Sequence, residues 1–390
     1  MNIVFVSNAI TPHQIPICDE LTALKGVSVK FLESINIDKN TLPIGWRASC
    51  KRDYVISYDF ICRNRDAIIE EILAADVVLY GSGDFSLLKT RLSAGNLTFL
   101  YSERIYKNLK QVLKWPYHLW KYSRMYDRHE NLYLLCASAF SAADYRKAGC
   151  FKDKAYKWGY FTEVNDFDIE ASLDVSMSGT AHLMWCARFL TWKHPELPVK
   201  MARILKDKGY RFTLDMYGSG VELENTKNLA KELGVEDIVS FKGDTPNKDV
   251  LGAMRNHDIF LFTSDKNEGW GAVANEAMSN GCVLVGSSAI GSVPFLVEDG
   301  VNGCIFQSED VDSLTSKVEW LLQHRKEMKQ MAVEGYNTMK AQWTPKQAAE
   351  RFLSLADCLS KGEDTPFLNG PCSHAEPLSN NWYKKLIEDD

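Results

Sequence analysis

Short apolar runs alternate with amphipathic stretches along most of the chain. The first half opens with an apolar run at residues 2–7, an amphipathic stretch at residues 15–24 and a second apolar run at residues 27–32. Runs of this length predict buried strands, and the amphipathic stretch predicts a helix. Further strand candidates in this half are residues 76–80, 97–101 and 132–137. This alternation predicts a doubly wound parallel α/β sheet.

A second alternating series follows a polar and acidic stretch at residues 166–179, which we interpret as an interdomain linker. Its strand candidates are residues 181–187, 211–217, 238–241, 258–262, 282–285 and 304–306. The chain has 390 residues, which is too long for one ordinary core and favours two domains. Thr344 and Pro345 begin a helical pattern that extends to residue 359, and residues 362–390 form a polar tail.

Composition narrows the class of protein. Hydrophobic residues make up 45% and charged residues 25% of the chain, as in globular proteins generally. The net charge of −6 gives no overall nucleic-acid signature. The ten cysteines lack metal-ligand spacing, and reduced thiols fit a cytoplasmic protein. We read residues 1–6 as a strand rather than a signal peptide, and no apolar run reaches the roughly 18 residues that span a bilayer.

The stretch at residues 258–306 carries the clearest candidate chemistry. A buried-strand candidate is followed by a loop with Gly269, Trp270 and Gly271 and then by a helical pattern. In a parallel sheet, the carboxyl end of a strand and the next helix N-terminus form an anion site, which glycines let a phosphate approach closely. Glu268 and Glu276 frame this loop, and carboxylates accept hydrogen bonds from sugar hydroxyls. This combination predicts a sugar-nucleotide site, with one acid for each sugar.

These residues also resemble a known family. Glu268 and Glu276, followed by Ala277-Met278 and Gly281, resemble the Glu-x7-Glu motif of retaining GT-B glycosyltransferases, in particular of glycosyltransferase family 4 (glycosyl transferases group 1). Ser264 resembles the serine that usually precedes this motif, and residues 297–303 resemble its usual sequel. The alternative for the two acids alone is a chance pair on a helix surface. The resemblance covers residues 181–345 strongly and residues 1–160 weakly.

The resemblance implies a GT-B fold, in which two doubly wound Rossmann-like domains face a cleft and a C-terminal helix crosses back to the first domain. We expect an acceptor domain at residues 1–170, a nucleotide-sugar donor domain at residues 171–343, and a crossover helix and tail at residues 344–390. The implied activity is transfer of a sugar from a UDP- or GDP-sugar to a hydroxyl acceptor, with retention of anomeric configuration. No metal and no further cofactor are expected. The rival readings are an epimerase or hydrolase of a sugar nucleotide and a non-catalytic sugar-nucleotide-binding scaffold.

Two cations follow the strand candidate at residues 181–187. Arg188 comes directly after it and Lys193 five positions later, so together they could clamp a diphosphate. The pair resembles the Arg…Lys pair of family 4, although His194 stands where relatives commonly have glycine after the lysine. The alternative is a pair of surface cations. We expect Arg188, Lys193 and Glu268 to be the catalytic residues, with Glu268 on the donor sugar.

The remaining expected donor contacts come from several loops. Glu276 is expected to hold the ribose hydroxyls, and Gly243-Asp244 to lie near the nucleobase. Leu223 stands where a dinucleotide fingerprint needs its third glycine, which argues against a nicotinamide enzyme. The expected nucleotide-binding set is Glu276, Gly269, Trp270, Gly271, Ser264, Gly218, Gly243, Asp244 and His13.

Two positions in the first domain stay open. His13 follows the first strand candidate, and it is either a solvated loop histidine or a contact to the donor phosphate or acceptor. Many relatives place a histidine after the strand at residues 97–101, but this chain has Ser102-Glu103-Arg104 there. Glu103 is either an acceptor-binding acid or the partner of Arg104 in an ion pair.

Residues 104–126 combine basic and aromatic side chains without an intervening acid. The segment holds Arg104, Lys107, Lys110, Lys114, Lys121 and Arg124, together with Tyr106, Trp115, Tyr117, Trp120, Tyr122 and Tyr126. This pattern suits an anionic membrane surface, and the main alternative is a helix with one packed aromatic face and one solvated basic face. Nucleic acid is a third choice, without a nucleic-acid motif to support it. We therefore predict a lipid-linked glycan acceptor and a peripheral location on the inner face of the cell membrane.

Overall fold

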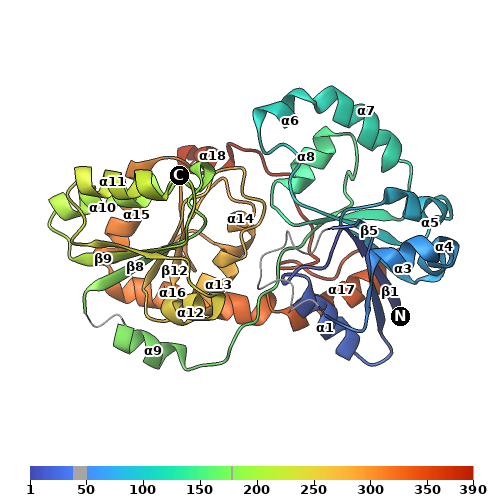
Figure 1. Cartoon of the computed structure of the whole chain (residues 1–390), viewed down its shortest axis with the longest axis horizontal. Helices are drawn as coiled ribbons and strands as arrows, with labels where there is room; N and C mark the ends of the chain where they lie inside the picture. Colours follow the sequence, from blue (N-terminus) through green and yellow to red (C-terminus); the bar gives the residue numbers. More distant parts are fainter. Residues whose placement is uncertain (38–50, 177–178, 390) are drawn as a thin grey trace. The chain divides into compact units, whose positions relative to one another are not determined.

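The structure is a computed structural model that describes residues 1–37, 51–176 and 179–389 (Figure 1). Residues 177 and 178 of the expected linker lie outside the described part. The chain forms two compact units. Unit 1 comprises Met1–Thr162 and Gln342–Ser379, and unit 2 comprises Glu163–Ala341 and Asn380–Asp390.

Unit 1 contains a seven-stranded sheet in the order β3-β2-β1-β4-β5-β6-β7, in which all neighbouring strands are parallel. The strands are β1 (Asn2–Ser7), β2 (Ser28–Glu33), β3 (Val55–Ile56), β4 (Val77–Tyr80), β5 (Thr98–Ser102), β6 (Leu132–Cys136) and β7 (Ala155–Lys157). Apolar side chains of the central strands are buried on both sides of the sheet, as a sheet covered by helices requires. The strand order reverses between β1 and β4.

The helices of unit 1 come from both of its chain segments (Figure 1). They are α1 (Ile15–Ala23), α3 (Tyr58–Arg63), α4 (Arg65–Ala74), α5 (Lys89–Ser93), α6 (Leu109–Leu113), α7 (Trp115–Met125), α8 (Ser141–Lys147) and α17 (Pro345–Ser360). Thr344 caps α17 by accepting a hydrogen bond from the Gln347 N–H at 3.1 Å. Phe352 of α17 packs against Phe99 of β5, and α17 also contacts α1. The expected return of this helix to the first domain is confirmed.

Unit 2 contains a six-stranded parallel sheet in the order β10-β9-β8-β11-β12-β13. Its strands are β8 (Ala181–Cys186), β9 (Phe212–Tyr217), β10 (Val239–Gly243), β11 (Ile259–Phe262), β12 (Val283–Ser287) and β13 (Cys304–Phe306). The strand order reverses between β8 and β11, which is the same topology as in unit 1. The predicted class, two doubly wound Rossmann-like sheets, is therefore confirmed.

The helices of unit 2 alternate with these strands (Figure 1). They are α9 (Ile169–Ser176), α10 (Glu196–Asp207), α11 (Leu223–Glu232), α12 (Asn247–Met254), α13 (Val273–Ser279), α14 (Val293–Leu296), α15 (Val311–Gln323), α16 (Arg325–Gln342) and α18 (Trp382–Asp389). None of the helices in the described ranges is long and apolar enough to cross a bilayer.

The chain enters unit 2 earlier than the sequence analysis expects. The polar stretch that we interpret as a linker contains Ile169 and Leu173, and both side chains belong to the hydrophobic core of unit 2. Gly281 leaves room for them, because an added Cβ there would lie 2.8 Å from the Ile169 side chain. The boundary therefore falls between Thr162 and Glu163, and the few apolar positions within the acidic stretch account for the shift.

The tail is divided between the two units, whereas the sequence analysis assigns all of residues 344–390 to the first domain. Cys372 N–H donates to the Lys157 carbonyl at 2.8 Å and Lys157 N–H to the Ser373 carbonyl at 2.7 Å, so this segment extends the edge of unit 1 beside β7. The terminal α18 belongs to unit 2. There Trp382 Nε1 donates to the Ser288 carbonyl at 2.9 Å, and the Tyr383 ring is buried.

Candidate active site

The reversal of strand order between β8 and β11 marks the expected ligand position in unit 2. In open α/β sheets, ligands bind outside the carboxyl ends of the strands at such a switch point, where neighbouring loops diverge. The loop after β8 carries Arg188 and Lys193, and the loop after β11 carries Ser264 and Glu268. The fold therefore brings two separate predicted sequence features to one edge of one sheet.

Lys193, Glu268 and Ser264 form a connected polar group at this edge. Lys193 Nζ makes an ion pair with Glu268 Oε2, and their side chains are only 12% and 11% exposed. Ser264 Oγ donates a hydrogen bond to the same carboxylate oxygen at 3.0 Å. Both partners hold the carboxylate in a fixed orientation, and its other oxygen keeps its capacity to accept hydrogen bonds.

A buried brace that the sequence analysis does not identify supports this group. Thr263 Oγ1 donates to the Lys193 carbonyl at 2.7 Å and accepts a hydrogen bond from Trp185 Nε1 at 2.9 Å. Thr263 and Trp185 are buried, so the two loops are tied together beneath the charged groups. A hydroxyl residue directly after a buried strand is the available sequence signal, but its partner lies 70 residues away.

Glu276 lies in the first turn of α13, and its side chain is half-buried. Burial raises the pKa of Glu276, and a hydrogen bond from Asn247 opposes this shift. Burial also raises the pKa of the Cys186 thiol to about 12, with a further rise caused by Glu276 and an opposing effect of Lys193. Cys186 is thus within electrostatic range of both groups, and it is another residue that the sequence analysis does not single out.

Arg188 is exposed at the carboxyl end of β8. Within the described ranges, its guanidinium makes neither a hydrogen bond nor an ion pair with another side chain. The contrast with Lys193 is clear, because Lys193 is held by Glu268 and lies 4.3 Å from the centroid of the Trp192 ring. The two predicted cations therefore differ in state: one is fixed and the other is available to an anionic ligand.

The loop after β9 lies directly against the loop after β8. Gly218 has φ +117°, and an added Cβ would overlap the Ala187 carbonyl oxygen. Gly220 has φ +149° and approaches Phe189 in the same way, while Phe189 N–H donates to the Ser219 carbonyl at 2.8 Å. Glycine is required at both positions by backbone conformation and by close approach.

The predicted nucleobase position lies on the β10 side of this loop. Gly218 N–H donates to the Gly243 carbonyl at 2.8 Å, and Gly243 has φ +72°. Ser219 Oγ donates to Asp244 Oδ2 at 2.8 Å. Gly218, Gly243 and Asp244 are therefore brought together, as a common role near one ligand requires.

The indole of Trp270 points into the interior of unit 2. Its side chain is fully buried, and Nε1 donates to Asn275 Oδ1 at 2.8 Å. The neighbouring Gly271 has φ +79°, and an added Cβ would overlap the Phe262 ring. The indole has a packing role, so only the backbone of the loop at Gly269, Trp270 and Gly271 is in a position to meet a ligand.

His194 follows Lys193 in the left-handed conformation, with φ +50°. This conformation accounts for the glycine expected there by family resemblance. His194 Nδ1 lies 2.9 Å from Glu196 Oε1 and Nε2 lies 3.6 Å from Asp265 Oδ2. Burial alone would lower the pKa of His194, but these two carboxylates outweigh it and raise the pKa to about 9. His194, Asp265 and Glu309 could together offer three metal ligands, and a charged imidazole between carboxylates accounts for the same arrangement.

His13 of unit 1 is a packed residue. Its ring is stacked on Tyr160, with centroids 5.1 Å apart and an angle of 3° between the planes. Burial lowers the pKa of His13, and Glu103 opposes this shift. This environment differs from the solvated loop that was one of the two readings.

Glu103 and Arg104 do not pair with each other. Glu103 accepts hydrogen bonds from Tyr160 and Lys107. Arg104 is buried, lies 3.6 Å from Asp144 and is stacked over the Phe140 ring. Of the two readings for Glu103, the ion pair with Arg104 is wrong.

Comparison with known proteins agrees with this geometry. Residues 179–338 match the family model of glycosyl transferases group 1. Over 105 residues, the chain is 33% identical to D-inositol 3-phosphate glycosyltransferase of Corynebacterium aurimucosum. The aligned region covers 27% of this chain and 24% of that protein. Over 124 residues, it is 32% identical to an uncharacterized glycosyltransferase of Haemophilus influenzae, covering 32% of this chain and 34% of that protein. The chain thus spans between 24% and 34% of the length of these curated relatives.

Solved structures extend the likeness to both units. HepE of Anabaena in complex with UDP superimposes with a TM-score of 0.67 over 93% of this chain and 100% of that chain, at 15% identity. Sucrose-phosphate synthase of Thermosynechococcus elongatus gives a TM-score of 0.63 over the same shares, also at 15% identity. The fold is GT-B. Within this GT-B chain, the family match lies in unit 2 and contains every expected site residue except His13.

Proposed function

We propose that this GT-B chain is a retaining glycosyltransferase that moves a hexosyl group from a nucleotide sugar to a hydroxyl of a glycan acceptor in polysaccharide biosynthesis. The observation that carries the proposal is the group formed by Lys193, Glu268 and Ser264 at the switch point of unit 2. It lies in the range that matches glycosyl transferases group 1. The solved structures of HepE contain UDP or UDP-glucose, which favours a UDP-sugar over a GDP-sugar here.

Arg188 and Lys193 have complementary roles in this proposal. Arg188 is exposed and offers a planar fork of donors, which suits the oxygens of a diphosphate. Lys193 is held in place by Glu268, so its charge is oriented before the donor binds. Negative charge develops on the departing diphosphate in the transition state, and fixed cations stabilise it most effectively.

The two acids divide the sugars of the donor between them. Glu268 is oriented by Lys193 and Ser264, and its remaining lone pairs would accept hydrogen bonds from hydroxyls of the transferred sugar. Glu276 is half-buried in the first turn of α13 and would hold the ribose hydroxyls. Because burial raises the pKa of Glu276, ribose binding that uses the carboxylate should weaken as the pH falls through that raised pKa.

Isothermal titration calorimetry with UDP tests this division. We expect Glu276→Ala to weaken UDP binding about tenfold or more, because a charge-assisted hydrogen bond is lost. Glu268→Ala should leave UDP binding nearly unchanged and reduce sugar transfer, since UDP lacks the transferred sugar. The division of roles is wrong if both variants bind UDP equally well or equally poorly. A thermal-shift series with UDP-, GDP-, ADP- and TDP-sugars identifies the nucleotide beforehand.

Product analysis separates transfer from the rival activities. Incubation of the donor with and without an acceptor distinguishes a transferase from a hydrolase or epimerase, which would consume or convert the donor alone. A non-catalytic scaffold would bind the donor and return it unchanged. Transfer with inversion at the anomeric carbon, read by NMR of the product, would contradict retention.

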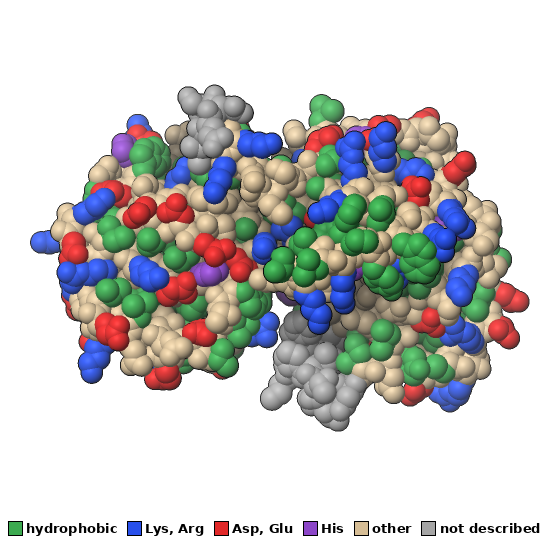
Figure 2. All heavy atoms as spheres, turned by 90° about the horizontal axis from the view of Figure 1, so that it is seen from above, with side chains coloured by type: hydrophobic (Ala, Val, Ile, Leu, Met, Phe, Trp, Pro, Cys, Tyr) green, Lys and Arg blue, Asp and Glu red, His purple; other side chains and the backbone are tan. Residues whose placement is uncertain are grey.

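We also propose that unit 1 binds an anionic membrane surface, with a lipid-linked glycan as the acceptor. The α6–α7 surface comprises the exposed residues Leu109, Leu113, Trp115, Tyr117 and Trp120 and the basic residues Lys110, Lys114, Lys121 and Arg124. Leu109 and Leu113 are 70% and 73% exposed. Figure 2 shows hydrophobic side chains bordered by lysines and arginines on the face that carries α6 and α7. Exposed apolar residues beside cations fit the interface of an anionic bilayer.

The basic and aromatic segment divides into an inner and an outer set, and this favours the membrane reading over simple packing. Tyr106 and Tyr126 are buried, as the packed-helix alternative requires. Trp120 and Tyr117 are 55% and 53% exposed, which packing within unit 1 does not explain. Arg104 and Lys107 are engaged by Asp144 and Glu103 and are not counted among the surface cations.

Vesicle cosedimentation tests the membrane proposal. Replacement of Lys110, Lys114, Lys121 and Arg124 by Gln should weaken binding to anionic vesicles, because each cation near such a surface contributes roughly 1 kcal/mol. A matched control replaces four exposed lysines elsewhere, Lys200, Lys231, Lys326 and Lys346, by Gln. Binding should increase with anionic lipid and decrease with salt. Equal recovery of all three proteins on neutral and anionic vesicles would reject the membrane proposal and favour a water-soluble acceptor.

A further inference from the structure

Unit 1 has a hollow at its own switch point that the donor site does not use. It lies where the strand order reverses between β1 and β4, which is the position where open α/β sheets bind ligands. The hollow has a volume of about 400 Å³, within the range of about 300–1,000 Å³ typical of small-molecule sites. Among the residues that line it are Ser7, Ser82, Tyr101, Ser102, Glu103 and Tyr160.

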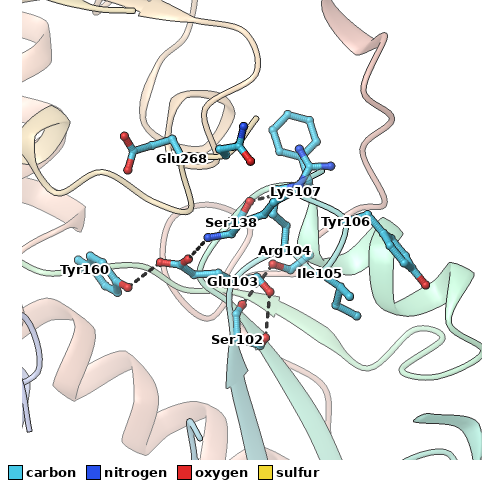
Figure 3. Close-up of polar contacts among 12 residues, drawn as sticks. Ser102, Glu103, Arg104, Ile105, Tyr106, Lys107, Ser138, Tyr160 and Glu268 are labelled. Atoms are coloured by element: carbon cyan, nitrogen blue, oxygen red, sulfur yellow. Dashed lines mark hydrogen bonds and ion pairs between the residues drawn. The ribbon is translucent and has the colours of Figure 1, made fainter. Parts of the chain in front are cut away.

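Glu103 is the charged residue in the lining of this hollow, and its carboxylate is oriented from two sides. Tyr160 OH donates to Oε1 at 2.7 Å and Lys107 Nζ donates to Oε2 at 2.6 Å. Figure 3 shows the carboxylate pointing toward Tyr160. The side chain remains 30% exposed. A carboxylate has about four acceptor positions, so each oxygen retains capacity for a hydroxyl of a ligand.

Aromatic rings form another part of the lining. Tyr101 and Tyr160 lie edge to face, with centroids 6.4 Å apart, and His13 is stacked on Tyr160. Burial raises the pKa of Tyr160 far above neutral pH and lowers the pKa of His13. The rings are therefore uncharged at neutral pH, and His13 holds the Tyr160 ring in position.

The charge of the hollow selects against anions. Its lining carries the carboxylate of Glu103 and neutral hydroxyls, including Ser7 and Ser82, whose Oγ atoms are 3.4 Å apart. Lys107 is bound to Glu103, and the neighbouring Arg104 is turned toward Asp144. A phosphate placed here would meet a carboxylate before it met a cation that is not already paired.

We propose that this hollow binds an uncharged sugar unit of the acceptor. Glu103 accepts a hydrogen bond from a sugar hydroxyl, and the C–H face of the sugar lies against Tyr101 and Tyr160. A sugar offers both hydroxyl donors and an apolar face, so it matches an oriented acid beside neutral rings. This inference rests on the proposed glycosyltransferase function and adds the class of the acceptor group: a neutral glycosyl unit rather than a phosphorylated one.

Saturation-transfer NMR on the full chain tests this inference directly. The probes are methyl α-glucoside, methyl α-galactoside, methyl α-mannoside and N-acetylglucosamine, together with glucose 6-phosphate and mannose 6-phosphate. We expect at least one neutral probe to bind, and Glu103→Gln to weaken its binding about ten- to a hundredfold, because a hydrogen bond to a charged acceptor is lost. Tyr160→Phe keeps the ring, removes one support of the carboxylate and should weaken binding by less.

A matched control and a UDP titration make the result specific. Glu130→Gln changes an exposed acid shortly before β6, at the amino-terminal end of the strands and therefore away from the hollow, and should leave sugar binding unchanged. UDP binding should stay within about twofold in all three variants. The inference is overturned if no neutral probe binds, if only the phosphorylated probes bind, or if Glu103→Gln and Tyr160→Phe both bind the neutral probe as the wild type does. Absence of UDP binding in the wild type would instead contradict the proposed function.

Discussion

The two switch points have the same strand topology, but backbone contacts define the one in unit 2 and side chains define the one in unit 1. In unit 2, the loops after β8 and β9 lie against each other through their backbones, and Gly218 is required for this close approach. In unit 1, the loops leave a hollow of about 400 Å³, and side chains such as Glu103 and Tyr160 give it its chemistry. A site defined by backbone requires glycines and charged residues at fixed spacing along the sequence. In a site defined by side chains, the residues can lie at any spacing along the sequence.

This difference explains why only one of the two sites can be predicted from the sequence. The Glu268 and Glu276 spacing is local, because a loop and the first turn of α13 fix it. Tyr160 lies 57 residues after Glu103, and nothing in the sequence connects them.

The donor site should depend strongly on its two cations. Arg188→Ala and Lys193→Ala should each reduce turnover about ten- to a thousandfold, because each removes a cation that stabilises the negative charge developing on the leaving diphosphate. Steady-state kinetics with the nucleotide sugar identified by thermal shift measures this. Arg211→Ala is the matched control, because Arg211 is exposed and directly precedes β9, at the amino-terminal end of the strands of the same sheet. Wild-type turnover in both folded variants would remove the diphosphate role.

Glycine replacement should separate a backbone-defined site from one defined by side chains. At Gly218, an alanine would combine φ +117° with overlap on a backbone carbonyl, so we expect a loss of about 2–4 kcal/mol of stability. At Gly81 of unit 1, the nearest atom to an added Cβ is the Ser7 hydroxyl at 3.2 Å, which is able to rotate away. Gly81→Ala should therefore change stability by less than about 1 kcal/mol.

Chemical denaturation of both variants measures the difference. Gly252→Ala provides a baseline, because an added Cβ at this position in α12 meets no atom within 4 Å. Equal losses at Gly218 and Gly81 would mean that the two switch points are packed in the same way.

The histidines in the loops after β1 and β8 should have pKa values shifted in opposite directions from the usual value. Carboxylates raise the pKa of His194 to about 9, whereas burial lowers the pKa of His13 below its usual value. His194 therefore stabilises the fold fully below about pH 6.5, and this contribution is lost as the pH rises through about 9. His13 acts in the opposite sense, because stability is lost as the pH falls below about 6.5.

NMR titration of the two imidazoles measures their pKa values, and denaturation of His194→Gly at pH 6 and pH 9.5 measures the stability term. We expect that term to be no more than about 2 kcal/mol after allowance for the remaining solvent access. Glycine keeps the left-handed backbone at this position, so the change isolates the imidazole. A pKa of His194 near 6.5 would mean that the contacts with Glu196 and Asp265 have no electrostatic effect.

The predictability of the fold and of the candidate site follows from the range of the interactions. The alternation of strands and helices predicts both sheets, because each strand and each following helix is a local pattern. Lys193, Glu268 and Ser264 are predicted from motif spacing, and the fold brings them together. The roles of these residues remain predictions.

Other features depend on contacts that no local pattern records. The indole of Trp270 turns inward because it donates a hydrogen bond to Asn275 and packs against the Phe295 ring. Ile169 and Leu173 look like part of a polar linker until Gly281 makes room for them. Trp382 and Tyr383 lie in a polar tail, and their partners in unit 2 are 94 and 78 residues away.

The passage of the chain between the units has a practical consequence for protein engineering. The chain passes from one unit to the other at residue 162, again at residue 341 and a third time at residue 379. A gene fragment that stops at residue 162 would lack α17 and would leave Phe99 and Trp158 without the Phe352 ring that covers them. Exchange of acceptor specificity by recombination with a related gene would therefore have to transplant two separate segments of coding sequence at once.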